Sequence, residues 1–413
     1  MNISDSERIT SVLEKIGYKK SSNIESADLV LINMCSVRQS AVDRVYGKIN
    51  DFSKLKSKNP NFKIILTGCV LKSDRQKLKN KVDFILDIKN LVKLPEILNT
   101  KNYLNINDSL KIKPKYQSSF SAFVPIMTGC NNFCTYCAVP YTRGKEISRP
   151  AKEILAEIKN LIQNSYKEIW LLGQNVNSYK NGKITFPKLL KMVNKIKGNY
   201  WIRFTSPHPK DFSDELIKVM AKSKKITPYL NLPVQSGDDE VLKRMNRPYT
   251  VKHYKSLIKK IGVAFKKYRT GLEKEIAIST DVIVGFPGET KKQFENTVKL
   301  FREIKYDMAY IAKYSPRSGT AASKLNDNVS LKEKEKRYKF LTDILKETVL
   351  ENNKKYLGKK VEVLIESKKG NVYFGKTRSY KTVKINSNKN LMGKLIEARI
   401  IGALNWGLKG VLE

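Results

Sequence analysis

Three cysteines lie close together near the middle of the chain, at Cys130, Cys134 and Cys137. Their C-x3-C-x2-C spacing puts three thiolates on one loop. Three thiolates can ligate three irons of a cubane 4Fe-4S cluster and leave the fourth iron open to another molecule. A structural zinc ion would need a fourth cysteine or histidine nearby, but His208 and His253 are the only histidines and both are distant in sequence. The spacing therefore favours an iron–sulfur cluster with an open iron.

The two remaining cysteines, Cys35 and Cys69, follow short apolar runs at residues 29–34 and 64–67. An amphipathic helix over residues 5–16 and a second helix between the two runs predict a parallel α/β sheet. Because open α/β sheets bind ligands at the carboxyl ends of their strands, we expect both thiols at such an edge, just past the strand ends. The polar residues 105–120 indicate a linker.

The segment after the linker repeats strand and helix several times. We expect strands at residues 122–127, 169–173, 201–205, 229–234, 278–284 and 308–314, with helices such as 152–163, 251–265 and 291–304 between them. This alternation predicts a full or partial parallel barrel, a fold that places its chemistry at the carboxyl ends of the strands. A long charged helix from Leu331 to about Lys355 closes the segment.

The last part of the chain carries five short β-type runs separated by Gly, Asn and Ser. Such a pattern predicts a small antiparallel barrel of the OB-like kind. Basic residues, Lys376 and Arg378 among them, alternate there with aromatic ones, which suits single-stranded RNA. Alternatively, the aromatic residues form the core and the lysines are only solvated. The chain as a whole is predicted to be an α/β multidomain protein with domains at residues 1–112, 118–350 and 356–413.

The charge balance is strongly positive, because 79 lysines and arginines stand against 39 acidic residues, a net charge of +40. Nucleic acid is the usual partner of so basic a protein, and the lysine enrichment of an AT-rich genome is the alternative. The chain contains no apolar run of about 18 residues, the length that would predict a membrane span. The N-terminus lacks the basic and apolar regions of a secretory signal, so the expected location is the cytoplasm.

Longer motifs carry a resemblance to a known family. The loop Gly129–Pro150, with Tyr136 just before its last cysteine, is similar to the radical loop of the MiaB-type tRNA methylthiotransferases, which are radical S-adenosylmethionine enzymes. The resemblance continues through LGQNVNSY at 172–179, TSPHP at 205–209, LPVQSG at 232–237, RMNRPYT at 244–250, DVIVGFPGET at 281–290 and SPRSGT at 315–320. Upstream, NMCSVR at 33–38 and TGC at 67–69 match the family's N-terminal domain, and the C-terminal barrel resembles its TRAM domain.

The resemblance implies that the protein adds a methylthio group to carbon 2 of isopentenyladenosine next to the anticodon of a tRNA. It implies S-adenosylmethionine and two 4Fe-4S clusters as cofactors. Cys130, Cys134 and Cys137 would hold the radical-forming cluster, and Cys35 and Cys69 the sulfur-donating auxiliary cluster. Bases of an RNA loop can be splayed out to reach such a site. The implied partners are the anticodon loop and a reducing protein such as flavodoxin or ferredoxin, and we expect a monomer.

Three alternative functions stay open. The Cys-Ser-Val-Arg that begins at Cys35 resembles the isopentenyladenosine branch of the family. The branch that acts on threonylcarbamoyladenosine tends to show Cys-Thr-Val there, and the branch that acts on a ribosomal protein tends to show Cys-Gly. The third alternative is an RNA-binding protein with a single working cluster that has lost sulfur insertion.

The sequence departs from the family pattern at the auxiliary cluster. The family uses three cysteines there, and the first lies at the end of a strand before the first helix. Residues 1–8, MNISDSER, align with the start of that helix, so we expect an N-terminally shortened chain whose third ligand is absent. Three explanations are open: a native ligand upstream of residue 1, a cluster held by two cysteines and an exogenous ligand, or loss of sulfur donation.

Further site residues are expected at the strand ends of the central barrel. By resemblance, Gly173, Gln174 and Asn175 help to bind S-adenosylmethionine, and the alternative is a plain strand-to-helix turn. Ser206 and Gln235 end the next strands, where they can hydrogen-bond methionine or ribose or serve only as local caps.

Charged residues complete the predicted site. Asp281 lies on a strand that the sequence predicts to be buried, where a carboxylate needs a partner such as a cofactor hydroxyl or an arginine. Arg143, shortly after the cysteine loop, is expected on a substrate phosphate or on the methionine carboxylate. Lys376 and Arg378 are expected to bind the RNA.

Overall fold

The computed structural model describes residues 1–37, 39–100 and 108–413, so part of the predicted linker at 105–120 lies outside the described residues. The chain forms two compact units, each built from several stretches. Unit 1 comprises residues 1–118, 127–149 and 315–325, and unit 2 comprises residues 119–126, 150–314 and 326–413. Unit 1 thus contains all five cysteines. The three-domain division expected from the sequence stays a prediction.

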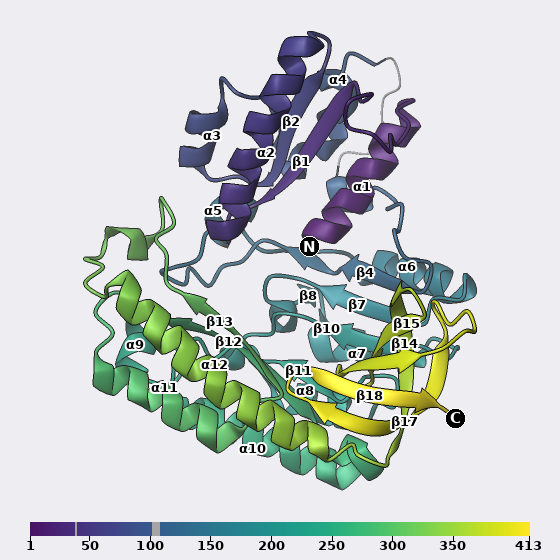
Figure 1. The fold of residues 1–413 in the computed structure, drawn as a ribbon, viewed down its shortest axis with the longest axis vertical. Helices are drawn as coiled ribbons and strands as arrows, with labels where there is room; N and C mark the ends of the chain where they lie inside the picture. The colour runs from purple at the N-terminus through teal and green to yellow at the C-terminus, as the bar shows by residue number, and fades with distance from the viewer. Residues whose placement is uncertain (38, 101–107) are drawn as a thin grey trace. The chain divides into compact units, whose positions relative to one another are not determined.

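A three-stranded parallel sheet with helices on both faces forms the body of unit 1 (Figure 1). Ile65 packs in one core with α1, and its neighbours Ile64 and Leu66 pack in a second core with α2. Because alternate side chains of a strand point to opposite faces, α1 and α2 cover opposite faces of the sheet. The elements are α1 (Asn2–Lys15), β1 (Leu29–Cys35), α2 (Gln39–Lys58), β2 (Lys63–Cys69), α3 (Lys72–Leu78), β3 (Phe84–Ile85) and α4 (Leu94–Ile97).

The register of this sheet places two cysteines side by side. β1 and β2 pair so that Cys35 lies opposite Cys69. Both are the last residues of their strands, not the first residues beyond them as the sequence predicted. Gly68 has a φ of +95°, and a Cβ atom there would lie 2.5 Å from the carbonyl oxygen of Met34. Only glycine therefore allows the two strands to end so close together.

Unit 2 contains the six parallel strands that the sequence predicted (Figure 1). They form two three-stranded sheets, β10-β7-β4 and β11-β12-β13, and an isolated bridge between Ile202 and Ile226 extends the pairing of β10. Of the two forms that the sequence predicted, a full or a partial parallel barrel, the structure therefore has the partial one. The strands are β4 (Ser121–Pro125), β7 (Glu168–Leu172), β10 (Trp201–Phe204), β11 (Tyr229–Asn231), β12 (Ala277–Val284) and β13 (Met308–Lys313).

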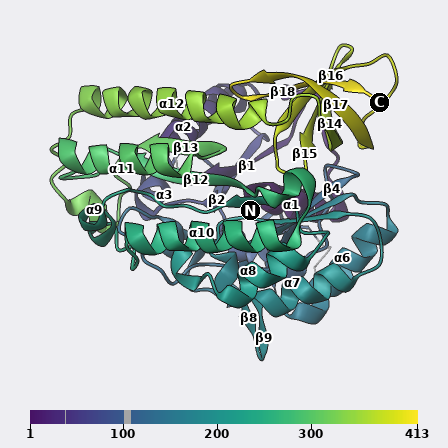
Figure 2. The same ribbon diagram turned by 90° about the horizontal axis from the view of Figure 1, so that it is seen from below.

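Helices follow the strands of unit 2 and cover their outer side (Figure 2). Neighbouring helices pack in pairs, α6 on α7, α7 on α8, α8 on α10 and α11 on α12. The predicted long helix is α12. The helices are α6 (Ala151–Gln163), α7 (Phe186–Lys195), α8 (Asp214–Lys222), α9 (Asp239–Arg244), α10 (Val251–Tyr268), α11 (Lys291–Ile304) and α12 (Leu331–Lys354), and a small ribbon is formed by β8 (Lys180–Asn181) and β9 (Ile184–Thr185).

The C-terminal strands close into a barrel with the order β14-β15-β16-β18-β17. The predicted small barrel is confirmed, but it is not wholly antiparallel, because β16 and β18 pair in parallel. Tyr373 lies in its core with Val363, Ile365 and Ile385, so this aromatic side chain is structural. Trp406, by contrast, is 46% exposed. The strands are β14 (Lys360–Lys369), β15 (Val372–Thr377), β16 (Thr382–Asn386), β17 (Leu395–Leu404) and β18 (Gly407–Leu412).

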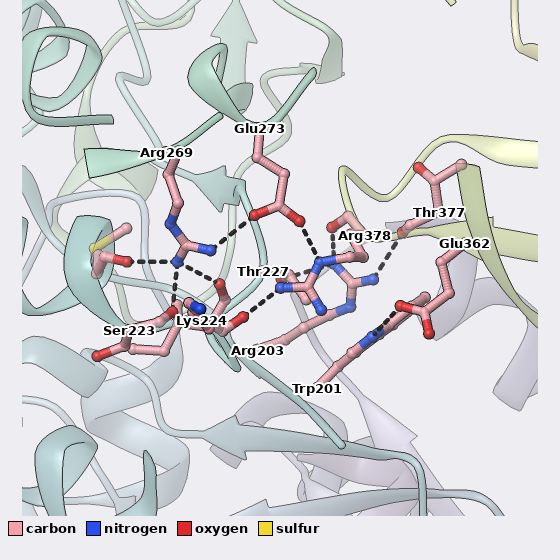
Figure 3. A network of polar contacts seen from close by, with 12 residues as sticks. Trp201, Arg203, Ser223, Lys224, Thr227, Arg269, Glu273, Glu362, Thr377 and Arg378 are labelled. Carbon is pink, nitrogen blue, oxygen red and sulfur yellow. Dashed lines mark hydrogen bonds and ion pairs between the residues drawn. The ribbon is translucent and has the colours of Figure 1, made fainter. Parts of the chain in front are cut away.

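A buried arginine joins strand β10 to this barrel (Figure 3). The Arg203 Nε donates to Glu168 Oε1 at 2.6 Å, and its terminal nitrogens donate to the carbonyl oxygens of Thr377 at 2.9 Å and Arg378 at 2.8 Å. Loss of either partner of such a pair is strongly destabilising, because it leaves a buried charge uncompensated. The C-terminal barrel is therefore an integral part of unit 2.

Lys376 and Arg378 belong to the same junction, and the RNA-binding role expected for them stays a prediction. The Arg378 guanidinium pairs with Glu273 and donates to the carbonyl oxygen of Lys224. The Lys376 Nζ donates to Thr382 Oγ1 at 2.7 Å. Both side chains are half-buried and bond protein groups.

Glu366, also at this junction, predicts a pH dependence of stability. Burial, with the nearby Glu168 carboxylate, raises its pKa from 4.5 to about 7. The folded state therefore binds this proton more tightly than the unfolded state does. The resulting contribution of Glu366 to the free energy of unfolding is fully present below its ordinary pKa and is lost as pH rises through about 7. Glu366→Gln should remove much of this fall in thermal unfolding measured between about pH 5 and about pH 8. The control variant Glu397→Gln, at an exposed position, should keep the fall of stability with pH. An equal dependence of stability on pH in both variants would contradict the attribution to Glu366.

Candidate functional site

The cysteine loop is closed at its base by two short antiparallel strands. β5 (Met127–Thr128) pairs with β6 (Ile147–Ser148), and the five-residue helix α5 (Val139–Arg143) lies between them. Inside the loop, the Cys130 amide donates to the Gly144 carbonyl at 3.1 Å and the Cys137 amide to the Cys134 carbonyl at 2.9 Å. The backbone around the cysteines is therefore held by the loop itself.

One glycine makes the closure of the loop possible. Gly129 has a φ of +77°, and a Cβ atom there would lie 2.0 Å from the carbonyl oxygen of Lys145. Any side chain at this position would push the two sides of the loop apart, next to Cys130. We therefore attribute the Gly-Cys pair in the sequence to a close approach of the backbone.

The three thiols of the loop fit a cubane cluster. Cys130 and Cys134 are each 9% exposed, Cys137 is more open, and none forms a disulfide. Burial raises the pKa of the Cys130 thiol, so binding an iron has to displace a tightly held proton. Within the described residues, no three His, Cys, Asp or Glu side chains lie close enough to hold one metal ion. A cubane needs a wider spacing, because each thiolate binds a different iron.

The second cysteine pair is held by an arginine that the sequence assigned to another role. Arg143, 3% exposed, donates from Nε to Cys69 Sγ at 3.2 Å and from a terminal nitrogen to Asp5 Oδ2 at 2.6 Å. Its guanidinium is thus committed to protein groups. That Arg143 binds a substrate phosphate or the methionine carboxylate stays a prediction.

In unit 2, the residues predicted at the strand ends show strained backbone. Ser206, after β10, has a φ of +58°, and Gln235, after β11, has a φ of +70°. Non-glycine residues adopt this conformation at a cost of about 1–3 kcal/mol, and such residues cluster at functional sites. The Gln235 amide donates to the carbonyl of Asp281 on β12, so backbone hydrogen bonding keeps it in place.

Unsatisfied polar atoms accompany these strained residues. Gln174 Oε1 and Asn175 Oδ1, which follow β7, are buried and have no hydrogen-bond partner within the described part of the protein. A buried acceptor without a donor is unfavourable, so these oxygens await a ligand with N–H or O–H groups. The methionine amino group and ribose hydroxyls of S-adenosylmethionine offer such donors. Gly173 lies just before them, at the end of β7.

Asp281 lies in the middle of β12 and has the partner that a carboxylate on a strand requires. Asn231 Nδ2 donates to Asp281 Oδ2 at 3.0 Å. The side chain is only half-buried, less than the apolar sequence of the strand predicted. Its role in cofactor binding stays a prediction.

His208, which was not among the predicted site residues, is a buried histidine after β10. It is 4% exposed, and its Nδ1 accepts from the Lys210 amide at 3.2 Å, so the neutral ring carries its proton on Nε2. Burial lowers the pKa of His208 to about 2, which keeps the ring neutral. Nε2 has no partner among the described residues and is therefore a buried donor, complementary to the orphan acceptors of Gln174 and Asn175. In the sequence, His208 stands between two prolines in the TSPHP motif that carries part of the family resemblance.

Two family models match parts of this chain. The model of the radical SAM superfamily matches residues 124–301, and that of the uncharacterized protein family UPF0004 matches residues 1–87. A tRNA-2-methylthio-N(6)-dimethylallyladenosine synthase of Clostridium botulinum (strain Hall) is 44% identical over 99% of this chain and 94% of its own length. The enzymes of that name from Clostridium novyi and from Thermoanaerobacter sp. strain X514 are 42% and 41% identical, over 99% and 100% of this chain and 94% and 90% of their lengths.

The chain belongs to this family of methylthio-dimethylallyladenosine synthases. It is therefore a radical S-adenosylmethionine enzyme of the tRNA methylthiotransferase class, and membership implies S-adenosylmethionine and 4Fe-4S clusters as its cofactors. The family resemblance seen in the sequence motifs is thereby confirmed.

Solved structures support the fold of this family member. The radical S-adenosylmethionine methyltransferase TsrM of Kitasatospora setae, with cobalamin and a 4Fe-4S cluster bound, superposes with a TM-score of 0.54 at 11% identity, over 78% of this chain and 73% of that chain. The cobalamin-dependent enzyme OxsB gives 0.51 at 11% identity, over 84% and 53%. At this identity the likeness concerns the fold alone. Among the described residues, no helix has the length and apolarity that crossing a membrane requires.

Proposed function

We propose that this protein transfers a methylthio group to carbon 2 of isopentenyladenosine next to the anticodon of a tRNA. The observation that carries the proposal is the 44% identity to a named synthase over 99% of the chain, which includes both cysteine sets. When bound, the clusters and S-adenosylmethionine supply the radical, the sulfur and the methyl group.

The protein's own residues divide the work between the two units. In unit 1, Cys130, Cys134 and Cys137 hold the radical-forming cluster on a loop whose backbone is already fixed. Cys35 and Cys69, paired in register, hold the auxiliary cluster, and its third ligand stays a prediction. In unit 2, residues that follow the strands bind S-adenosylmethionine, together with Asp281 within β12; those that follow the strands are Gly173, Gln174, Asn175, Ser206 and Gln235.

The partners follow from the same proposal. The substrate is a tRNA, gripped through exposed basic residues of the C-terminal barrel such as Lys368, Lys369 and Lys384, since Lys376 and Arg378 are held by protein groups. A reducing protein such as flavodoxin or ferredoxin supplies electrons, and the protein acts as a monomer in the cytoplasm.

Nucleoside analysis of tRNA tests the proposed activity. A strain that lacks this gene should lose the methylthio form of isopentenyladenosine and accumulate isopentenyladenosine, and a plasmid copy should restore the modification. The readout is mass spectrometry of digested bulk tRNA. Full loss of the methylthio group is expected, because the strain then lacks the protein whose two clusters are needed to form the carbon–sulfur bond.

Each alternative function has its own signature in the same strain. Loss of the methylthio group from threonylcarbamoyladenosine, or from a ribosomal protein, would move the protein to another branch of the family. Unchanged nucleosides and unchanged ribosomal proteins would contradict the transferase proposal and favour an RNA-binding protein with one working cluster.

A further inference from the structure

A hydrogen-bond network in unit 2 holds the main chain on both sides of His208. Asn177, in the turn after β7, donates from Nδ2 to the His208 carbonyl oxygen at 2.9 Å and accepts from the His208 amide at 2.8 Å. The Asp211 amide donates to the same carbonyl oxygen at 3.1 Å, and its carboxylate accepts from Asn175 Nδ2 at 2.8 Å. His208 and Asn175 therefore belong to one network, which joins the chain after β7 to the chain after β10.

The imidazole ring of His208 is also held in place. Its Nδ1 accepts from the Lys210 amide at 3.2 Å, which leaves the proton of the neutral ring on Nε2. The Tyr249 ring packs edge-on against it, with the ring centroids 5.6 Å apart. The Tyr249 hydroxyl in turn donates to the carbonyl oxygen of Val234 at 3.0 Å, directly before Gln235. The direction of the Nε2–H bond is therefore fixed by contacts from three loops.

The network ends in two polar atoms that lack a partner. His208 is 4% exposed and Asn175 is 2% exposed. Neither the His208 Nε2 nor the Asn175 Oδ1 has a hydrogen-bond partner in the part of the chain that the structure describes. Leaving such buried groups unpaired is unfavourable. One rigid network thus presents a donor and an acceptor together, as expected of residues that bind a polar ligand.

We propose that His208 is a further binding residue for S-adenosylmethionine, with its Nε2–H group donating to an oxygen or a ring nitrogen of the bound cofactor. The inference rests on the proposed function, which assigns Gln174 and Asn175 to the same cofactor. S-adenosylmethionine offers the required acceptors in its carboxylate, its ribose and its adenine. Because burial lowers the pKa of His208, the ring stays neutral and does not repel the sulfonium cation.

The other histidine of the chain provides a matched control. His253 is exposed and lies on α10, also in unit 2. Its ring also neighbours Tyr249, with 6.4 Å between the centroids, but its Nε2 lies 3.5 Å from the carbonyl oxygen of Pro209. The two rings thus share a neighbour and differ in what their Nε2 atoms face. A role limited to packing against Tyr249 would make the two histidines similar.

The experiment is equilibrium dialysis of labelled S-adenosylmethionine against the reconstituted full-length protein, without a reductant so that the cofactor is not cleaved. His208→Phe keeps an aromatic ring but removes the donor, so the dissociation constant should rise about tenfold. His208→Gln carries an N–H group on a side chain of similar reach and should recover most of the affinity. His253→Phe should bind the cofactor as the unmodified protein does.

Nuclear magnetic resonance of protein labelled with 15N-histidine keeps the test valid should His208→Phe fail to fold. In the His253→Phe variant His208 is the only histidine, so every histidine side-chain signal comes from its ring. Addition of S-adenosylmethionine should shift the Nε2 resonance.

An unchanged affinity in folded His208→Phe, or an Nε2 resonance that does not move while the cofactor binds, would overturn the inference and leave the proposed function intact. A loss of affinity for tRNA alone, measured by filter binding, would assign His208 to the RNA and overturn it too. An unmodified protein that binds no S-adenosylmethionine would instead contradict the proposed function itself.

Discussion

Replacing Cys134 with alanine is expected to abolish the reductive cleavage of S-adenosylmethionine. Cys134 is the middle ligand of the loop, and its carbonyl oxygen accepts the Cys137 amide at 2.9 Å, a bond that alanine preserves. The variant therefore loses a ligand without losing the turn. Because one of the three thiolates of the loop is then missing, we expect that the radical-forming cluster does not assemble. Production of 5′-deoxyadenosine under dithionite, measured by chromatography, should drop to background.

The matched control is the same substitution at Cys35, in the same unit. That variant should cleave S-adenosylmethionine as well as the unmodified protein does. Cleavage of S-adenosylmethionine that persists in Cys134→Ala would show that Cys134 is not a ligand of the radical-forming cluster. Loss of cleavage in both variants would point instead to a general collapse of unit 1, which circular dichroism can detect.

Sequence patterns located the strands of the central barrel well, because buried parallel strands are continuous apolar runs. β12 was predicted at 278–284 and spans Ala277–Val284. β11 was predicted to reach residue 234 but ends at Asn231, since Pro233 has no amide hydrogen for the ladder. Apolarity reports burial, and only the backbone chemistry of a residue such as proline decides where pairing stops.

The same patterns could not identify the partners of the basic residues. Arg143 pairs with Asp5 and Arg378 with Glu273, acidic residues more than a hundred positions away. An arginine in a sequence shows a charge but not the carboxylate that neutralises it, so both were assigned to RNA or cofactor phosphates and carboxylates. The strain at Ser206 and the unsatisfied Nε2 of His208 are likewise properties of the folded backbone and its packing.

Replacing Cys35 with alanine is expected to separate the two chemistries of the enzyme. Cys35 lies opposite Cys69 and has no role in the cysteine loop that begins at Gly129. The iron content should fall from about eight to about four atoms per chain, because one of two 4Fe-4S clusters is lost. Cleavage of S-adenosylmethionine should continue, whereas methylthiolation of tRNA, measured by mass spectrometry of nucleosides, should stop.

Val37→Ala is the control for this variant, because Val37 is 53% exposed, lies two residues from Cys35 and keeps the carbonyl that Arg317 binds. It should retain both clusters and both activities. Methylthiolation that survives in Cys35→Ala would show that the sulfur does not come from a cluster on Cys35. Loss of methylthiolation together with cleavage would mean that the cysteine loop depends on the sheet edge for its own cluster. Only loss of methylthiolation with cleavage intact supports two separate cysteine sites, one that forms the radical and one that supplies the sulfur.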